Sequence, residues 1–136
     1  MAALTAGRST PLRETDQVES HPVKAGAKIF AGGLACLDAT GFAVPGATSA
    51  TLRALGRAEV AVDNTAGQNG DQQVRTRRGV FRFANSAGAD QITRADVLTT
   101  AYIVDDQTVA KTNGGGTRSA AGTIRDVDAQ GVWVQF

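Results

Sequence analysis

The sequence predicts an all-β protein, a small β-sandwich or a partly open β-barrel with an extended N-terminal arm. The chain holds 16 glycines and one methionine and is 42% hydrophobic, a composition that favours short strands and turns over helical packing. Turn residues separate short segments of alternating apolar and polar residues at close spacing, as in small sandwiches and barrels. No segment has the apolar period of a long amphipathic helix.

Residues 1–22 differ from the rest of the chain in the spacing of their apolar residues, and they predict the arm. Their larger apolar side chains fit neither a helical nor a strand period. Pro11 and Pro22 favour extended backbone at the residues before them. Because such a segment cannot form a stable element alone, we expect it to bind a partner through apolar and basic anchors: Leu4, Arg8, Leu12, Arg13 and Val18. A frayed terminus without a role is the alternative.

Residues 23–136 predict one body domain, because a chain of 136 residues is long enough for one good hydrophobic core and too short for two. The first clear element of the body is a hairpin. Its strands, at 34–37 and 42–44, flank the turn residues Asp38-Ala39-Thr40-Gly41.

In a predicted strand over 72–84, the alternation of apolar and polar residues shifts by one position partway along. The apolar positions before Arg78 have one parity, and the two phenylalanines after it have the other. Since glycine tolerates positive φ, we expect a β-bulge at Arg78-Gly79. With the preceding strand, predicted over 52–62, the buried face would then hold four apolar residues: Val60, Val62, Phe81 and Phe83.

The second half of the body predicts a single helical turn and two hairpins. The helical turn falls at 93–98, the first hairpin pairs 99–104 with 108–111, and the last pairs 121–127 with 132–136. Because aromatic residues are few, we expect two of them to be substantially shielded: Tyr102 and Trp133.

Charge is balanced over the whole chain but uneven along it. There are 14 Lys and Arg against 13 Asp and Glu, a net charge of +1. Residues 51–84 hold six arginines against three acids, a net of +3, and residues 85–136 hold four basic residues against six acids, a net of −2. This asymmetry favours a complementary protein surface over nonspecific nucleic-acid binding, which needs a dominant basic footprint.

Within the basic half, Arg75, Arg77 and Arg78 form the main cluster, and the first two share a strand face. The simplest interpretation is a solvated strand face. The functional interpretation is a patch that contacts an acidic partner protein. Nucleic acid is disfavoured as a partner, because no aromatic residues interleave with these arginines along the sequence.

The residues that usually carry catalysis or bind metals are scarce. Cys36 is the only cysteine and His21 the only histidine, so an intrachain disulfide is excluded and the usual zinc patterns lack ligands. We expect Cys36 to be a small core residue and His21 to be a solvated residue of the arm. The sequence predicts no metal and no cofactor.

Aspartates in turns give the remaining chemical candidates. The segment at Asp38 resembles the Asp-Thr-Gly of aspartic proteases with an inserted Ala, but such an enzyme needs two carboxylates at one site. A hairpin turn explains the segment fully, and we predict that the protein is not an enzyme. A weak cation site would use four turn aspartates: Asp105, Asp106, Asp126 and Asp128.

Two targeting signals are also missing from the sequence. No apolar run approaches the roughly 20 residues of a membrane helix, and the N-terminus lacks the apolar core of a signal peptide. We therefore expect no membrane association, and we expect the protein to act in the compartment where it is made or in a particle assembled there.

Across residues 23–136 the chain resembles the capsid cement, or head decoration, proteins of tailed phages, especially Mu-like phages. The similarity lies in the opening KAGAKIFAGGLACLDATGFAVPG, the segment GVFRF at 79–83, the stretch AYIVDDQTVAKT and the closing AGTIRDVDAQGVWVQF. The arm, ALTAGRSTPLRETD, is similar to the arms of Mu-like relatives. The resemblance implies a small β protein on the outer surface of the virion capsid, assembled in the host cytoplasm, that bridges major capsid proteins, often as a homotrimer.

Three other functions remain open at this point. The chain could be another virion module, such as a head-completion or tail protein. A small hydrolase would use Asp38 or the acidic turns, and a nucleic-acid binder would use the arginines.

Overall fold

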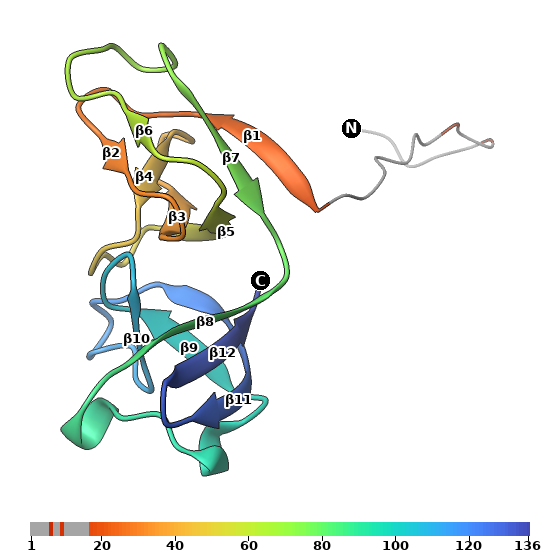
Figure 1. Cartoon of the computed structure of the whole chain (residues 1–136), viewed down its shortest axis with the longest axis vertical. Helices are drawn as coiled ribbons and strands as arrows, with labels where there is room; N and C mark the ends of the chain where they lie inside the picture. Colours follow the sequence, from red (N-terminus) through yellow and green to blue (C-terminus); the bar gives the residue numbers. More distant parts are fainter. Residues whose placement is uncertain (1–5, 7–8, 10–16) are drawn as a thin grey trace.

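The computed structural model describes residues 6, 9 and 17–136, and it is built almost entirely from β-strands (Figure 1). The all-β class predicted from the sequence is thereby confirmed. A five-stranded sheet, a closed five-stranded barrel and a two-stranded sheet make up the described molecule. Among these residues, no helix is long and apolar enough to cross a membrane.

The five-stranded sheet comes from the first part of the chain, and its neighbouring strands all run antiparallel. Its spatial order is β1-β7-β5-β3-β4. The strands are β1 (Val18–Pro22), β3 (Leu34–Leu37), β4 (Ala43–Pro45), β5 (Arg53–Ala58) and β7 (Gln73–Arg77). The two-stranded sheet pairs β2 (Lys28–Ile29) with β6 (Val62–Asp63).

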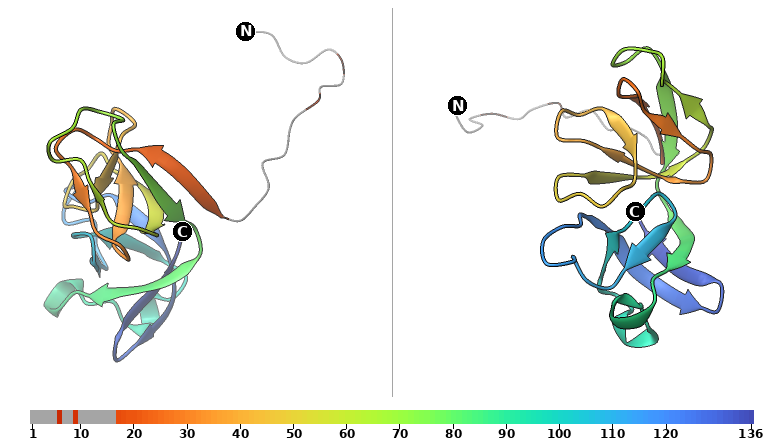
Figure 2. Two further views of the ribbon diagram at one scale, coloured as in Figure 1. Left: turned by 45° about the horizontal axis from the view of Figure 1, so that its top comes forward. Right: turned by 90° about the vertical axis from the view of Figure 1, so that its left-hand side faces the viewer.

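The closed barrel comes from the second part of the chain and lies next to the sheet (Figures 1 and 2). Its strands follow one another in the order β10-β8-β12-β11-β9, and β10 runs parallel to β8. They are β8 (Val80–Asn85), β9 (Thr100–Ile103), β10 (Thr108–Ala110), β11 (Ala120–Asp128) and β12 (Gly131–Gln135). Two short 3₁₀ helices, η1 (Gly88–Asp90) and η2 (Arg94–Asp96), connect β8 to β9.

Two hydrophobic clusters fill the molecule, where the length of the chain predicted one. Strand β3 separates them, because Leu34 and Cys36 point into one cluster and Ala35 into the other. The first cluster lies between the sheet and the barrel interior and includes Ile103, Ile124 and other barrel residues. The second lies on the opposite side of the sheet and holds eight buried residues: Val23, Ile29, Ala35, Ala43, Leu55, Ala58, Val62 and Val74. A sheet shared by both clusters lets a short chain support them.

The three predicted hairpins are confirmed. Strands β3 and β4 pair around the turn at Asp38, β9 pairs with β10, and β11 pairs with β12. The predicted helical turn is the 3₁₀ helix η2, whose start carries a capping box between Thr93 and Asp96. The barrel hairpins could be predicted from the sequence because apolar and polar residues alternate along their strands. Val132 and Val134, for example, are fully buried on either side of the half-buried Trp133.

The long strand predicted over 52–62 is wrong at its end. Strand β5 stops at Ala58, and Val60 is 43% exposed in the following turn. Val62 belongs to β6 and is buried, but it lies in the cluster beneath the sheet. The phase change at Arg78-Gly79 is real, with Gly79 at φ +154°. It is the crossing between two sheets, however, and no β-bulge, because β7 ends at Arg77 and β8 begins the barrel.

The four apolar residues predicted to share a buried face are therefore divided. Phe83 is buried in the cluster between sheet and barrel and Phe81 packs against that cluster, whereas Val62 lies in the other cluster. Both phenylalanines also contact the ring of Phe136. The predicted shielding of Tyr102 and Trp133 is partial, since both side chains are half-buried.

The boundary between arm and body also needs correction. Val18–Pro22, the last five residues of the predicted arm, form β1 and pair with β7 from Val18 opposite Arg77 to Pro22 opposite Gln73. At the ends of this ladder, Arg78 N–H donates to the Gln17 carbonyl and Val23 N–H donates to the Gln72 carbonyl. The folded body thus begins near Gln17, and β1 forms one edge of the five-stranded sheet. The strand escaped sequence analysis because it alternates no apolar residues.

Candidate protein-contact surface

The three arginines of the predicted patch lie on and just after strand β7. Arg75 and Arg77 share the face opposite to Val74 and Thr76, which are both buried. Arg75 is exposed and Arg77 is half-buried, while Arg78 is exposed beyond the end of the strand. The structure thus brings the first two side chains to one face, as the alternation predicted. Their role in binding remains a prediction.

A fourth arginine extends this patch toward the barrel. Arg57 on β5 lies directly opposite Arg77 in the register of the sheet. Glu59 Oε1 accepts hydrogen bonds from Arg57 Nη2 at 2.9 Å and from Arg77 Nε at 3.1 Å. The hydrogen bond from Arg57 and the two positive charges hold the pKa of Glu59 below its usual range. Among the described residues, the Glu59 carboxylate thus lies between two guanidinium groups of the patch.

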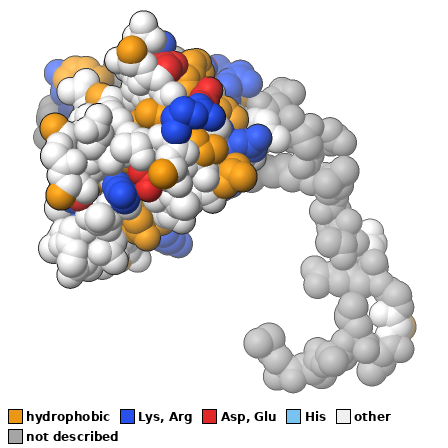
Figure 3. All heavy atoms as spheres, turned by 90° about the horizontal axis from the view of Figure 1, so that it is seen from below, with side chains coloured by type: hydrophobic (Ala, Val, Ile, Leu, Met, Phe, Trp, Pro, Cys, Tyr) orange, Lys and Arg blue, Asp and Glu red, His pale blue; other side chains and the backbone are white. Residues whose placement is uncertain are grey.

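Where the sheet meets the barrel, arginines lie over aromatic rings. The guanidinium of Arg57 is centred 4.3 Å from the ring of Phe81. Arg82 on β8 is paired with Trp133 on β12, and its guanidinium lies 5.7 Å from the indole ring. Both distances are those of cation–π contacts. Figure 3 shows a face of the molecule on which Lys and Arg side chains lie directly beside hydrophobic ones.

These residues enclose a groove of about 450 Å³. We call it the arginine–aromatic groove. Its walls come from the turn after β2, from β5, from β8 and from β12. The lining residues are Gly32, Arg57, Val80, Phe81, Arg82, Phe83 and Trp133. Along the sequence, Phe81 and Phe83 flank Arg82, but in space Arg82 lies over Trp133 and Arg57 lies over Phe81. These two contacts depend on the pairing of β8 with β12 and on the contact of sheet with barrel, and neither can be predicted from one sequence.

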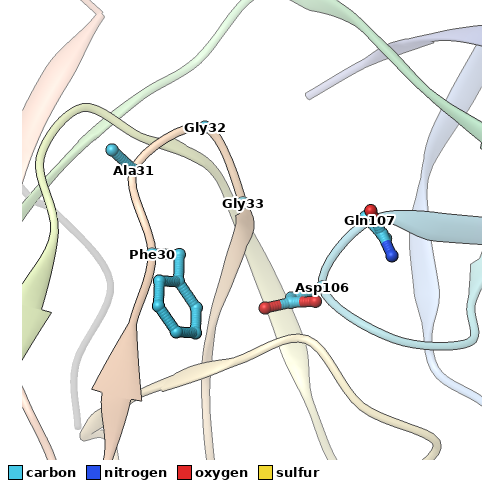
Figure 4. Close-up of a pocket in the computed structure, with 6 residues that line it drawn as sticks. All are labelled: Phe30, Ala31, Gly32, Gly33, Asp106 and Gln107. Carbon is cyan, nitrogen blue, oxygen red and sulfur yellow. The ribbon is translucent and has the colours of Figure 1, made fainter.

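A second hollow of about 420 Å³ also has Gly32 in its lining (Figure 4). It lies between the turn that follows β2 and the turn between β9 and β10, which carries Asp106 and Gln107. The side chain of Phe30 borders it and is 56% exposed, with Lys28 Nζ 5.3 Å from the ring. The hollow thus offers one exposed aromatic ring near a carboxylate, and it holds no cluster of catalytic groups.

Asp38, the main candidate for hydrolysis, serves the hairpin turn. Its Oδ1 accepts hydrogen bonds from the N–H groups of Thr40 and Phe42 and from the Thr40 hydroxyl, and its Oδ2 accepts one from Lys24 Nζ at 2.5 Å. The bonds from Lys24 and Thr40 hold the pKa of Asp38 well below its usual range. A carboxylate with so low a pKa is a poor general base, since it accepts a proton only weakly.

Cys36 and His21 also lie within the folded body. Cys36 is fully buried, as expected, and burial raises the pKa of its thiol to about 12. His21 is half-buried in β1 and lies 3.1 Å from Glu19 Oε2, so the expectation of a solvated arm residue is wrong.

The four turn aspartates do not come together as a cation site. Within the part of the chain that the structure describes, no three His, Cys, Asp or Glu side chains gather where they could hold a metal ion. Asp105 accepts a hydrogen bond from Gln107 N–H, Asp126 pairs with Arg94, and Asp128 accepts from the Trp133 indole.

Of the five predicted arm anchors, the structure describes one. Val18 is the first residue of β1 and is half-buried opposite Arg77. It therefore acts as part of the body. The other four lie outside the described residues: Leu4, Arg8, Leu12 and Arg13.

Comparisons of the chain with protein-family models, with curated proteins and with solved structures found no match.

Proposed function

We propose that this protein is a structural capsid decoration (cement) protein of a tailed phage, which binds the outer face of the major capsid protein shell and stabilises the head. The proposal rests on the sequence resemblance to Mu-like cement proteins together with one structural observation. Strand β1 is an edge strand, and it joins residues 1–16 to the body directly beside the arginine-bearing face of β7.

This arrangement suits a protein that bridges neighbouring subunits. A body with two packed clusters provides a rigid knob, and an N-terminal segment attached at a sheet edge can reach sideways from it. Sixteen extended residues span on the order of 50 Å, which is enough to reach an adjacent subunit. Copies held in a symmetric shell gain avidity from many weak contacts, so no single tight site is needed. In this proposal the protein is not an enzyme and takes no cofactor.

The proposal includes a homotrimer on the capsid, as the resemblance implies. The partner is the major capsid protein, and the basic patch of Arg75, Arg77 and Arg78 meets an acidic surface of that protein or of a neighbouring copy. In this view the protein acts in the virion after assembly in the host cytoplasm. Light scattering of the purified protein measures whether the trimer already exists in solution.

The test is the copy number of this chain on purified heads of the phage that encodes it. We expect near-stoichiometric occupancy, and heads without the chain should break at lower temperature. Heads that carry no copies would contradict the proposed function. In a decoration assay, replacing both Arg75 and Arg77 by Glu should reduce occupancy, because the charge that faces the partner is reversed. Arg53→Glu with Lys111→Glu, the same charge change elsewhere, should not.

A further inference from the structure

The arginine–aromatic groove has the composition of the energetic centre of a protein interface. Its lining combines two arginines, a tryptophan and phenylalanines, the residue types that are enriched where partners bind most tightly. Val80, on the same wall, is 44% exposed, an uncommon state for a large apolar side chain beside other apolar groups. The surface is thus partly apolar, and folding leaves it uncovered.

The two groove arginines retain donors for a ligand. A guanidinium carries five N–H donors, and a contact with a ring does not use them as hydrogen bonds to a carboxylate would. Among the described residues, no hydrogen bond or ion pair joins Arg82 to a carboxylate, and its guanidinium lies over the Trp133 ring. Arg57 uses Nη2 for Glu59. The cation–π contacts with the rings also help to hold both cations in place before a partner arrives, which reduces the entropy lost on binding.

The charge around the groove selects an acidic ligand. Arg57 and Arg82 line it, and the arginines of β7 adjoin it through the pairing of Arg57 with Arg77. The carboxylates on the neighbouring strands and turns already accept hydrogen bonds from this chain: Glu59 from Arg57 and Arg77, Asp126 from Arg94, and Asp128 from Trp133, Gln130 and Gly131.

We propose that the groove between β5 and strands β8 and β12 docks an acidic segment of a partner protein, in which an apolar side chain is flanked by carboxylates. The apolar side chain contacts Val80 and Trp133, and the carboxylates accept hydrogen bonds from Arg57 and Arg82. The inference rests on the proposed function for the identity of that partner, a subunit of the capsid shell.

The same observations disfavour a nucleic acid in the groove. Bases bind aromatic side chains by stacking on the ring face, but here guanidinium groups already lie over the rings of Phe81 and Trp133. Phosphate binding depends on many cations, and the chain has a net charge of only +1.

The experiment titrates the full-length protein with a defined probe, the peptide acetyl-Glu-Asp-Leu-Asp-Glu-amide, and follows the Trp133 indole N–H and the arginine Nε–H signals by NMR. We expect saturable shifts at Trp133, Arg57 and Arg82. Arg82→Gln and Arg57→Gln should each raise the dissociation constant about tenfold, because each removes a charged hydrogen-bond donor. The control Arg53→Gln removes an arginine at the other end of β5, outside the groove, and should leave binding unchanged.

Further probes separate the contributions of charge and apolar contact. A peptide with amides in place of carboxylates, and one with serine in place of leucine, should both bind more weakly. The inference is overturned if the acidic peptide shifts none of the three side chains, or if oligothymidylate of equal charge binds there more tightly. It is also overturned if the two Gln variants fold and bind as the parent does.

An assay on heads separates this inference from the proposed function. If the parent chain decorates heads and the Arg57→Gln, Arg82→Gln double variant decorates them equally well, the groove is not the docking site and the decoration function stands. If the parent chain does not decorate heads but the peptide result holds, the groove binds acidic segments and the proposed function is wrong.

Discussion

Asp38 illustrates how a single turn residue connects two parts of the fold. The aspartate lies at the turn between β3 and β4, where Thr40 and Phe42 donate to one carboxylate oxygen and Lys24 to the other. Lys24 lies two residues after the end of β1, so the ion pair ties this edge segment to the β3–β4 turn. The side chain of Asp38 is 12% exposed and that of Lys24 is 46% exposed, so solvent weakens the attraction only in part.

Asp38→Asn should destabilise the protein by about 1 kcal/mol at neutral pH, because the amide keeps the turn hydrogen bonds but loses the charged one. The pKa of Asp38 is lowered in the folded state. Its contribution to stability is therefore present above the unfolded pKa, near 3.8, and is lost as pH falls toward the folded value. Urea unfolding should show a difference between parent and variant that shrinks below about pH 4.

Asp105→Asn is the matched control for this prediction. Asp105 also serves a turn, by accepting a hydrogen bond from Gln107 N–H, but no ion pair to it is present among the described residues. Its substitution should cost less stability at neutral pH than that of Asp38, because it removes no ion pair. A constant difference for Asp38→Asn between pH 3 and pH 7 would show that the ion pair with Lys24 contributes nothing.

Among the elements, β1 has the clearest consequence for experiments on the N-terminus. The strand pairs with β7 along its whole length and covers an edge that would otherwise expose backbone hydrogen-bonding groups. The sequence predicts a 22-residue arm that the body does not need for folding, whereas in the structure the folded body begins near Gln17. Deletions on the two sides of this point should therefore behave differently.

Deleting residues 1–16 should leave the melting temperature nearly unchanged, because β1 stays in the sheet. Deleting residues 1–22 should cost about 2 kcal/mol, from a few backbone hydrogen bonds worth about 1 kcal/mol each, and should lower the melting temperature by roughly 8 °C. Differential scanning calorimetry on both truncated chains measures this. Equal melting temperatures for the two would mean that β1 adds nothing to stability.

Element by element, the success of sequence analysis depended on local signals. The barrel hairpins combine alternating apolar residues with dense turn residues, so both their strands and their turns were predicted. Strand β1 carries Glu19, Ser20 and His21 in its centre, and it exists because the edge of β7 is available to it. Such pairing over more than 50 residues of sequence leaves no local pattern.

The surface residues also divide into those predicted from a local pattern and those that depend on contacts between distant segments. The shared face of Arg75 and Arg77 was predicted from strand alternation alone. The contacts of Arg57 with Phe81 and of Arg82 with Trp133 depend on the sheet lying against the barrel and on the register of β8 with β12. Neither the packing nor the register is encoded within one segment, so the groove was missed.

At the scale of the whole molecule, β3 joins what would otherwise be two separate cores. Leu34 and Cys36 pack with barrel residues on one side, and Ala35 packs with Val23 and Ile29 on the other. Since the sheet cannot open without exposing both clusters, we expect sheet and barrel to unfold in one cooperative transition. Two natural reporters test this: the single tryptophan, Trp133, in the barrel, and the single cysteine, Cys36, between barrel and sheet.

We predict that Cys36 reacts with a thiol reagent only through global unfolding. Its side chain is fully buried, and burial raises the thiol pKa to about 12, so the native protein presents neither access nor thiolate. The free energy from the labelling rate should match that from urea unfolding followed by Trp133 fluorescence. In a Cys36→Ala background, Ala66→Cys in an exposed loop should label rapidly at all urea concentrations.

Rapid labelling of Cys36 while Trp133 keeps its native fluorescence would contradict this prediction. It would mean that the sheet separates from the barrel before either unfolds, and that the two clusters behave as independent units.

The position of β1 also determines how the body would respond to mechanical force. Whatever holds the chain before Gln17 pulls on the body through β1, whose ladder to β7 consists of bonds that run perpendicular to the strands. Tension along the strand axis loads the whole ladder at once, in shear, whereas tension across the sheet breaks the bonds one after another from the Gln17 end. A tether anchored in line with β1 would therefore withstand a larger force than the same tether pulled sideways. The sheet edge thus makes the strength of the attachment depend on its direction.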